Sequence, residues 1–428
     1  MEIKSLPVEI MSPVGSYESL MAAIQGGANS VYFGVGRLNM RSRSSQNFSL
    51  NDLDRIVEIA KTHNIKTYLT LNTIIYDDEM EEMETIVDRA KEAGISAIIA
   101  SDISVIEYAR RKDVEVHMST QTNITNLQAV KFFSRYADVM VTARELSLAQ
   151  VADIVKGIEK QEIKGPSGNL VQIEIFVHGA LCMAVSGKCY LSLDNMNYSA
   201  NRGACLQLCR RGYNVTDKEG EFELAIENEY IMSPKDLCTL EFIDKIIKAG
   251  VTVFKIEGRG RGPEYVKTVT RVYREAADAC LEGTFSPEKI ETWMQQLKKV
   301  YNRGFWEGYY LGRKLGEWTE RYGSLATHKK VYVGKVTNYF TKLGVAEIKM
   351  ETGELAVDDD IYITGPTTGV LEMTPGEIRV DLKPVQTARK GEMCSIKTPE
   401  LVRRGDKVYK VIEAKEEFKS VSISKSQS

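Results

Sequence analysis

The chain has 428 residues, with 56 lysines and arginines against 59 aspartates and glutamates, which leaves a formal charge of −3. Hydrophobic residues make up 43% of it, so a large core can form and extensive disorder is excluded. No run of about 18 apolar residues occurs, and the first residues lack the basic and apolar regions of a secretion signal. We therefore expect a cytoplasmic protein of two or three domains that does not span a membrane.

Short apolar segments alternate with amphipathic stretches from about residue 8 to residue 325. Strands are predicted at 8–13, 30–35, 66–72, 97–101, 114–120, 139–146, 172–179 and 252–258, which are rich in Val, Ile, Tyr or Phe. Helices are predicted at 17–25, 53–63, 79–93, 104–111, 127–136, 148–159 and 242–248. This alternation predicts an α/β fold, a (β/α)8 TIM-like barrel. A doubly wound open sheet is the alternative, which the lack of a GxGxxG turn disfavours.

Other regions depart from this alternation. Residues 179–237 are rich in Cys, Gly, Asn and Arg, and we expect an irregular insertion on the barrel, with a hairpin around 213–231. Long helices are expected over 263–311. Beyond residue 328, short strands separated by Gly, Asp and Pro predict a small all-β barrel module. The predicted domains are the barrel with its insertion at 1–327, the module at 328–412 and a disordered tail at 413–428.

The cysteines are concentrated in one part of the chain. Five of the seven lie between Cys182 and Cys238. Buried structural thiols are one interpretation, because unpaired cysteine is usually buried, but such clustering favours a metal or cluster site. Structural zinc usually takes closely spaced CxxC pairs, whereas thiolates from several loops suit an iron–sulfur cluster over a barrel mouth. The spacing therefore favours a four-thiolate iron–sulfur site, with zinc as the alternative.

The segment EIFVHGALCMAVSGKCYLS resembles the signature of the collagenase-like "U-thirty-two" peptidase family. The matching positions are Glu174, Phe176, Gly179, Ala180, Leu181, Cys182, Gly187, Cys189, Leu191 and Ser192. The similarity also covers the opening EIMSPVGSYESL, the later FKIEGRGRGPEYV and the C-terminal module. It therefore spans nearly the whole chain.

The family resemblance implies a function and a cofactor. Its members include tRNA hydroxylation proteins, which convert wobble uridine to 5-hydroxyuridine, and oxygen-independent hydroxylases of ubiquinone synthesis. It implies a 4Fe-4S cluster held by Cys182, Cys189, Cys205 and Cys238, with Cys209 as an alternative to Cys205 or Cys238. It also implies tRNA as the partner and prephenate, a small dicarboxylate, as the co-substrate.

Polar residues follow the predicted strands, and in such a barrel these strand ends form one site. We predict catalytic roles for Lys255, Glu257, Arg144 and Glu145, and substrate binding by Asn72, Arg41, Arg43, Gln121 and Arg259. The planar arginine fork matches the carboxylates of prephenate, although Arg41 and Arg43 also fit a solvated loop. Glu257 beside Lys255 suggests a general acid/base pair or a strand-end salt bridge.

Basic and aromatic residues that could hold RNA occur near the insertion and after residue 297. They are Arg202, Arg210, Arg211, Arg259, Arg261, Lys298, Lys299, Arg303, Arg313 and Lys314, with Tyr301, Phe305, Trp306, Tyr309 and Tyr310. Phosphate neutralisation and base stacking would use such side chains. The alternative is an amphipathic helix whose aromatic side chains pack on the barrel.

Peptidase activity is the alternative function, as the family label suggests. The sequence has neither HExxH nor GxSxG. His178 with Cys182 or Cys189 could form a Cys–His pair, and an aspartic dyad is not ruled out by the sequence. A non-catalytic role in a larger assembly is a third hypothesis. We favour an iron–sulfur enzyme that hydroxylates tRNA.

Overall fold

The computed structural model describes residues 8–43, 47–213, 230–312, 316–319 and 321–414. It divides into two compact units. The first consists of Met1–Leu297, Tyr301–Leu325 and Thr364–Leu371, and the second of Lys298–Val300, Ala326–Ile363 and Glu372–Ser428. Most of the predicted hairpin around 213–231, and all but the first two residues of the predicted tail, lie outside the described residues.

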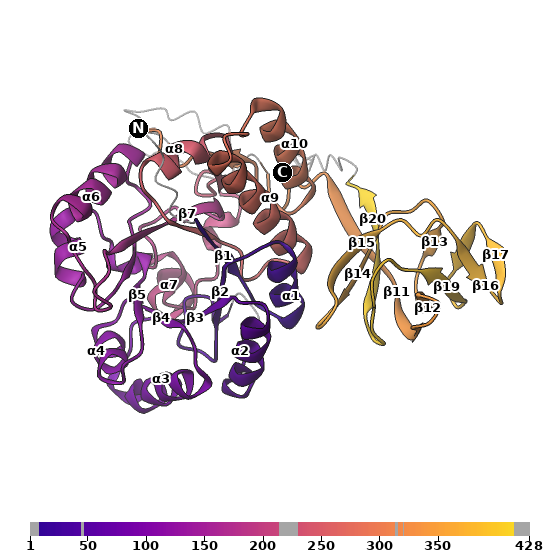
Figure 1. Cartoon of the computed structure of the whole chain (residues 1–428), viewed down its shortest axis with the longest axis horizontal. Helices are drawn as coiled ribbons and strands as arrows, with labels where there is room; N and C mark the ends of the chain where they lie inside the picture. Colours follow the sequence, from indigo (N-terminus) through magenta and orange to yellow (C-terminus); the bar gives the residue numbers. More distant parts are fainter. Residues whose placement is uncertain (1–7, 44–46, 214–229, 313–315, 320, 415–428) are drawn as a thin grey trace, which may run out of the picture. The chain divides into compact units, whose positions relative to one another are not determined.

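The first unit contains the predicted barrel. Its parallel strands are β1 (Glu9–Pro13), β2 (Ser30–Gly34), β3 (Lys66–Leu71), β4 (Ala97–Ala100), β5 (Val116–Met118), β6 (Val139–Val141), β7 (Gln172–Gly179) and β9 (Val253–Ile256). Neighbours pair in this order, and β9 pairs with both β7 and β1, which closes the ring. Figure 1 shows the helices arranged around these strands. The TIM-like fold is therefore confirmed, and the open-sheet alternative is wrong.

The barrel helices begin and end close to the predicted residues. They are α1 (Tyr17–Gln25), α2 (Leu53–Thr62), α3 (Met80–Ala93), α4 (Ile103–Arg111), α5 (Leu127–Phe133), α6 (Leu148–Lys160) and α8 (Ile243–Lys248). Ser16, Asp102, Asn126 and Ser147 accept a backbone N–H at four of the N-termini. Gly94 ends α3 at a φ of 78°, which favours glycine. Local capping thus marks the beginnings of four of these seven helices and the end of α3.

The segment 263–311 is helical only in part. It forms α9 (Pro263–Leu281) and α10 (Pro287–Lys299), followed by the short strand β10 (Phe305–Trp306), which pairs with β8 (Asp236–Cys238). The Trp306 indole donates to the Lys235 carbonyl at 3.1 Å, and the Tyr310 hydroxyl donates to the Phe176 carbonyl at 2.9 Å. These two aromatic side chains therefore pack on the barrel rather than facing solvent. No helix among the described residues is both long and apolar enough to cross a membrane.

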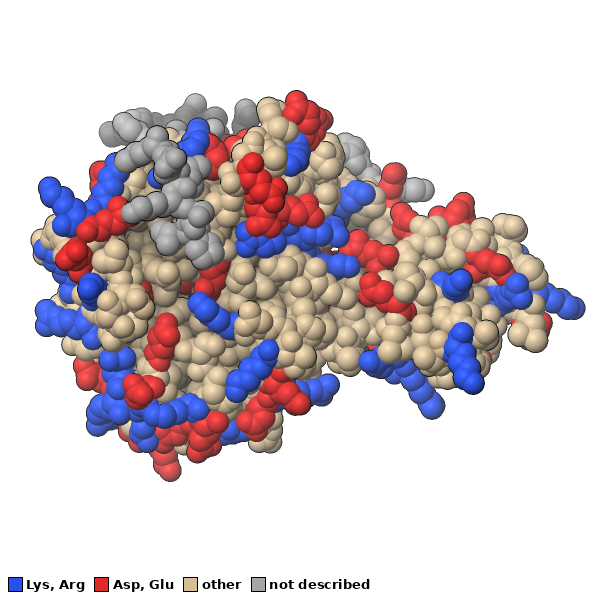
Figure 2. Space-filling view, viewed as in Figure 1, with Lys and Arg blue, Asp and Glu red and all other residues tan. Residues whose placement is uncertain are grey.

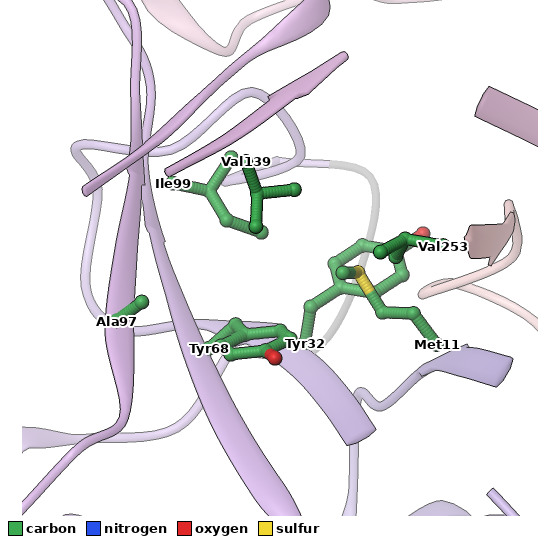
Figure 3. Packing of buried hydrophobic residues seen from close by; sticks show 7 residues of the cluster. All are labelled: Met11, Tyr32, Tyr68, Ala97, Ile99, Val139 and Val253. Carbon is green, nitrogen blue, oxygen red and sulfur yellow. The ribbon is translucent and has the colours of Figure 1, made fainter. Parts of the chain in front are cut away.

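Apolar side chains from several strands fill the inside of the barrel. Figure 3 shows the side chains of this cluster, which are Met11, Tyr32, Tyr68, Ala97, Ile99, Val139 and Val253. They come from β1, β2, β3, β4, β6 and β9, and all are buried. This filling is typical of a barrel of eight strands. Because apolar side chains fill the inside of the barrel, a ligand site is expected among the polar residues beyond the strand ends.

The C-terminal region is all-β, as predicted. The main sheet contains β11 (His328–Phe340), β12 (Val345–Met350), β14 (Ile361–Gly365), β15 (Gly369–Met373), β16 (Ile378–Val380), β17 (Lys383–Val385), β19 (Met393–Lys397) and β20 (Lys407–Glu413). Its order is β15-β14-β20-β11-β12-β19-β16-β17, and β13 (Glu354–Ala356) pairs with β18 (Thr387–Arg389). The central pairs β11–β20, β11–β12 and β12–β19 are antiparallel. Glu413, predicted to begin the tail, ends β20.

Candidate functional site

A cavity lies at the C-terminal ends of the barrel strands. It encloses about 1120 Å³, including space open to solvent. Most of the predicted site residues line it, namely Arg41, Asn72, Gln121, Arg144, Lys255, Glu257, Arg259, Cys182, Cys189 and Cys205. Glu145 and Arg43 do not, because Glu145 is exposed and Arg43 stacks over the Tyr198 ring at 4.4 Å. The structure thus brings most of the predicted site together and leaves Glu145, Arg43 and Cys238 outside the cavity.

The backbone that leads to Cys182 is held against the barrel. Gly179 has a φ of 102°, and a Cβ there would lie 2.3 Å from the Glu257 carbonyl oxygen, so only glycine fits without rearrangement. Arg144 Nη1 donates to the Ala180 carbonyl at 3.1 Å, and Arg210 Nη2 donates to the Leu181 carbonyl at 2.7 Å. These two arginines fix the residues just before Cys182.

The chain around Cys205 is fixed by the signature serine. The Leu206 N–H donates to Ser192 Oγ at 3.1 Å, and Ser192 is buried. Gly203 has a φ of 75°, and a Cβ there would lie 2.2 Å from the Asn39 carbonyl oxygen. The positioning roles of Ser192 and Arg210 were not predicted from the sequence, although Ser192 stands in the signature.

Four thiols line the cavity: Cys182, Cys189, Cys205 and Cys209. Burial raises the pKa of the Cys209 thiol to about 11; Arg210 acts in the opposite direction, and the other three thiols raise it further. Among the described residues, no three His, Cys, Asp or Glu side chains form a group that could hold a metal ion. The four thiols are therefore neighbours around one cavity without converging on a single point.

Cys238 lies apart from these four thiols. Its Sγ is 3.8 Å from the Tyr273 hydroxyl on α9 and 3.9 Å from Met294 Sδ on α10. It does not line the cavity, and burial raises its pKa to about 11 with no contribution from another thiol. Cys238 pairs with His178 in the β7–β8 ladder, and its side chain packs on α9 and α10. The structure thus places Cys209, and not Cys238, beside the other three thiols.

Lys255 and Glu257 are not an acid/base pair. Lys255 Nζ lies 2.7 Å from Glu174 Oε1, and both side chains are buried. Glu257 Oε1 accepts from Arg41 Nη2 at 2.7 Å. Burial raises the pKa of the Glu257 carboxyl, but Arg41, Arg144 and Arg259 outweigh it and lower the pKa to about 2. Glu257 is therefore an ionised acceptor near neutral pH rather than a proton donor.

Positive charge dominates the cavity wall. Arg259 Nη1 donates to Thr70 Oγ1 at 2.9 Å and to Asn39 Oδ1 at 3.1 Å, and burial lowers its pKa to about 10. Arg144 Cζ lies 3.7 Å from the centre of the Phe176 ring. The lining contains five cationic side chains and one carboxylate: Arg41, Arg144, Arg210, Lys255 and Arg259 against Glu257. Arg41 pairs with Glu257 and Lys255 with Glu174, so the net positive charge comes from Arg144, Arg210 and Arg259. Such a wall favours an anionic ligand.

The uncharged part of the wall offers amide groups. Asn72 Nδ2 donates to Ser119 Oγ at 3.3 Å, and Asn72 Oδ1 accepts from the Met40 N–H at 3.2 Å. Ser119 Oγ donates to Gln121 Oε1. Amides fixed in this way can recognise the polar edge of a planar ring.

His178 does not face the cavity. Its Nδ1 lies 3.3 Å from the Tyr273 hydroxyl, and burial lowers its pKa to about 3. Among the described residues, no histidine lines the cavity. The Cys–His pair considered for a peptidase is therefore not formed, because the structure directs His178 toward α9.

Comparison with known proteins places the chain in a family. Residues 15–320 match the model described as peptidase family U32. The chain belongs to peptidase family U32. The signature that carries Cys182, Cys189 and Ser192 lies in the matched region, as the sequence predicted.

Relatives within family U32 carry two kinds of name. A protein named collagenase from Porphyromonas gingivalis is 59% identical over 402 residues, which cover 94% of this chain and 97% of that protein. The tRNA hydroxylation protein P1 of Bacillus subtilis is 34% identical, covering 77% of each chain. A 23S rRNA 5-hydroxycytidine synthase of Escherichia coli is 35% identical, over 74% of this chain and 47% of that protein. Names alone therefore leave a peptidase and an RNA-modifying enzyme as candidates.

Proposed function

We propose that this protein is an iron–sulfur enzyme that hydroxylates C5 of the wobble uridine in tRNA. The observation that carries the proposal is a single cavity that combines four thiols with a surplus of cations. RNA-hydroxylating relatives support the same chemistry. A wobble uridine is already in a single-stranded loop, so its entry into a cavity would cost little unpairing energy.

The thiols of Cys182, Cys189, Cys205 and Cys209 are the proposed cluster ligands. Among the described residues, no three such side chains already form a group that could hold a metal ion. The choice of an iron–sulfur cluster over zinc therefore rests on the ligands coming from several loops rather than from closely spaced CxxC pairs. When bound, such a cluster supplies electron transfer. Arg144 and Arg210 would hold the loop before Cys182 in place.

The cationic wall is the proposed binding site for a small dicarboxylate such as prephenate. Arg41, Arg144 and Arg259 can bind carboxylates through planar forks. Glu257, kept ionised, orients Arg41 through their 2.7 Å contact. Asn72 and Gln121 stand where they could hydrogen-bond the uracil ring.

Nucleoside mass spectrometry tests the proposal. The protein would be expressed in a bacterial strain whose tRNA lacks 5-hydroxyuridine, together with Cys205→Ser and Arg144→Ala variants. The expected result is 5-hydroxyuridine with the wild type and little or none with either variant. If the wild type is expressed with iron bound and no hydroxylated nucleoside forms, the proposal is wrong.

A peptidase is the second candidate, because the 59% identical relative is named collagenase. The cavity offers poor support, since its described lining contains no histidine and only one carboxylate, Glu257. An aspartic dyad needs two carboxylates that share a proton. Gelatin cleavage by the wild type that is lost in Glu257→Gln and in Cys182→Ser would favour this candidate. Equal cleavage by all three preparations would indicate a contaminating protease.

A further inference from the structure

A groove adjoins the cavity within the first unit. Arg43, Leu206, Arg211, Ser233, Tyr301, Arg303, Arg321, Tyr322 and Gly323 are among its lining residues. Cys205, Gln207 and Arg210 line both the groove and the cavity. A ligand chain lying in the groove could therefore place one of its units in the cavity.

The groove is lined by arginines and by no carboxylate among the described residues. Arg43, Arg211 and Arg321 are exposed, and none forms an ion pair with any described side chain. Arg303 differs, because it is buried and lies 3.1 Å from Asp236. Elsewhere the charges are mixed, as Figure 2 shows over α3 and α4. Among the described residues these three exposed arginines have no acidic partner, and on a chain of net charge −3 they indicate a site for a polyanion.

Two tyrosines accompany these arginines. Tyr322 is 71% exposed, so its ring is open to a ligand. The Tyr301 ring is packed against Arg261, whose Cζ lies 3.5 Å from the ring centre. Exposed aromatic rings beside cations hold single-stranded nucleic acids, because bases stack on the rings while the cations neutralise phosphates.

We infer that this groove, defined by Arg43, Arg211, Arg321, Tyr301 and Tyr322, binds the single-stranded nucleotides that flank the base entering the cavity. The inference rests on the proposed function, since it assumes an RNA substrate. An acidic peptide would also be attracted by the arginines, but it would have no bases to stack on Tyr322. Stacking on Tyr322 therefore separates RNA from an acidic peptide.

Fluorescence anisotropy with a labelled anticodon-loop RNA tests the groove directly. In Arg211→Gln/Arg321→Gln, two lost phosphate contacts should lower the slope of log affinity against log salt by roughly 1.4, and the affinity about tenfold at about 0.15 M salt. Tyr322→Ala should weaken binding roughly fivefold or more without changing the slope, whereas Tyr322→Phe should bind like the wild type. The control variant Lys156→Gln/Lys160→Gln removes two positive charges from α6, outside the groove and the cavity. It should leave RNA binding unchanged.

The outcomes separate this inference from the proposed function. Wild-type affinity in both the double arginine variant and Tyr322→Ala would overturn the groove assignment, even if tRNA is hydroxylated. Groove-dependent RNA binding without any hydroxylated nucleoside would keep the groove and reject the proposed reaction. Displacement of the RNA by polyglutamate at equal charge concentration would indicate an acidic-peptide site and would overturn the inference.

Discussion

The buried ion pair between Lys255 and Glu174 should be a major determinant of barrel stability. Lys255→Met removes the partner of a carboxylate that is 0% exposed and whose second oxygen, Oε2, already has no hydrogen-bond partner in the described structure. Removing one member of a buried pair costs about 3–5 kcal/mol. The matched control is Lys66→Met, because Lys66 pairs with Glu9 at 2.9 Å but is 60% exposed. Loss of this exposed lysine should cost about 0–1 kcal/mol, because Glu9, although only 13% exposed, keeps the hydrogen bond from the Tyr68 hydroxyl at 2.7 Å.

Urea unfolding followed by tryptophan fluorescence measures this difference. All three tryptophans, Trp293, Trp306 and Trp318, belong to the first unit, so their fluorescence reports on that unit alone. A double Lys255→Met/Glu174→Met variant should recover much of the lost stability, because no unpaired charge remains buried. Equal effects of the two lysine variants, or a double variant no more stable than Lys255→Met, would refute the reasoning.

Two further predictions concern the cavity rim. The pKa of Glu257 is lowered from 4.5 to about 2, so its ionised form stabilises the fold above pH 4.5, and this contribution is lost as the pH falls toward 2. In Glu257→Gln, the urea concentration at the unfolding midpoint should therefore depend less on pH between 4.5 and 2 than it does in the wild type. The same pH dependence in both proteins would contradict the lowered pKa of Glu257. Gly179→Ala should destabilise the protein by well over the roughly 1 kcal/mol expected for Gly36→Ala. Both glycines have a positive φ, but a Cβ at Gly179 would lie 2.3 Å from the Glu257 carbonyl oxygen, whereas a Cβ at Gly36 would meet nothing within 4 Å. Similar melting temperatures for the two variants would exclude the close approach.

The fold could be predicted from the sequence because each strand–helix pair of the barrel carries its own local signals. Apolar strands of four to eight residues alternate with helices that are capped at residues such as Ser16 and Asp102. These signals are local, so they predict elements and their parallel order without knowledge of distant contacts. The segment after Lys299 was wrongly predicted as helix, because its aromatic residues bind the barrel through long-range contacts such as Tyr310 to Phe176.

The site residues could be predicted from the sequence only where they directly follow a barrel strand. Asn72, Arg144, Lys255 and Glu257 reach the cavity because parallel strands end together. Pairing among the charged groups was not predictable, since Lys255 contacts Glu174, a residue 81 positions away. The positions of Cys209 and Cys238 depend on how the irregular insertion folds back and on the antiparallel β8. The spacing of the cysteines along the chain therefore does not determine where Cys209 or Cys238 lies.

Iron and sulfide content tests the central claim most directly. The wild type and five single Cys→Ser variants would be purified anaerobically, and iron, acid-labile sulfide and visible absorbance would be measured per chain. A four-iron cluster held by the four cavity thiols predicts about four irons in the wild type and in Cys238→Ser, and loss of most iron when Cys182, Cys189, Cys205 or Cys209 is replaced. A colourless wild type without iron would contradict it, as would a Cys209→Ser variant that keeps its iron while Cys238→Ser loses it.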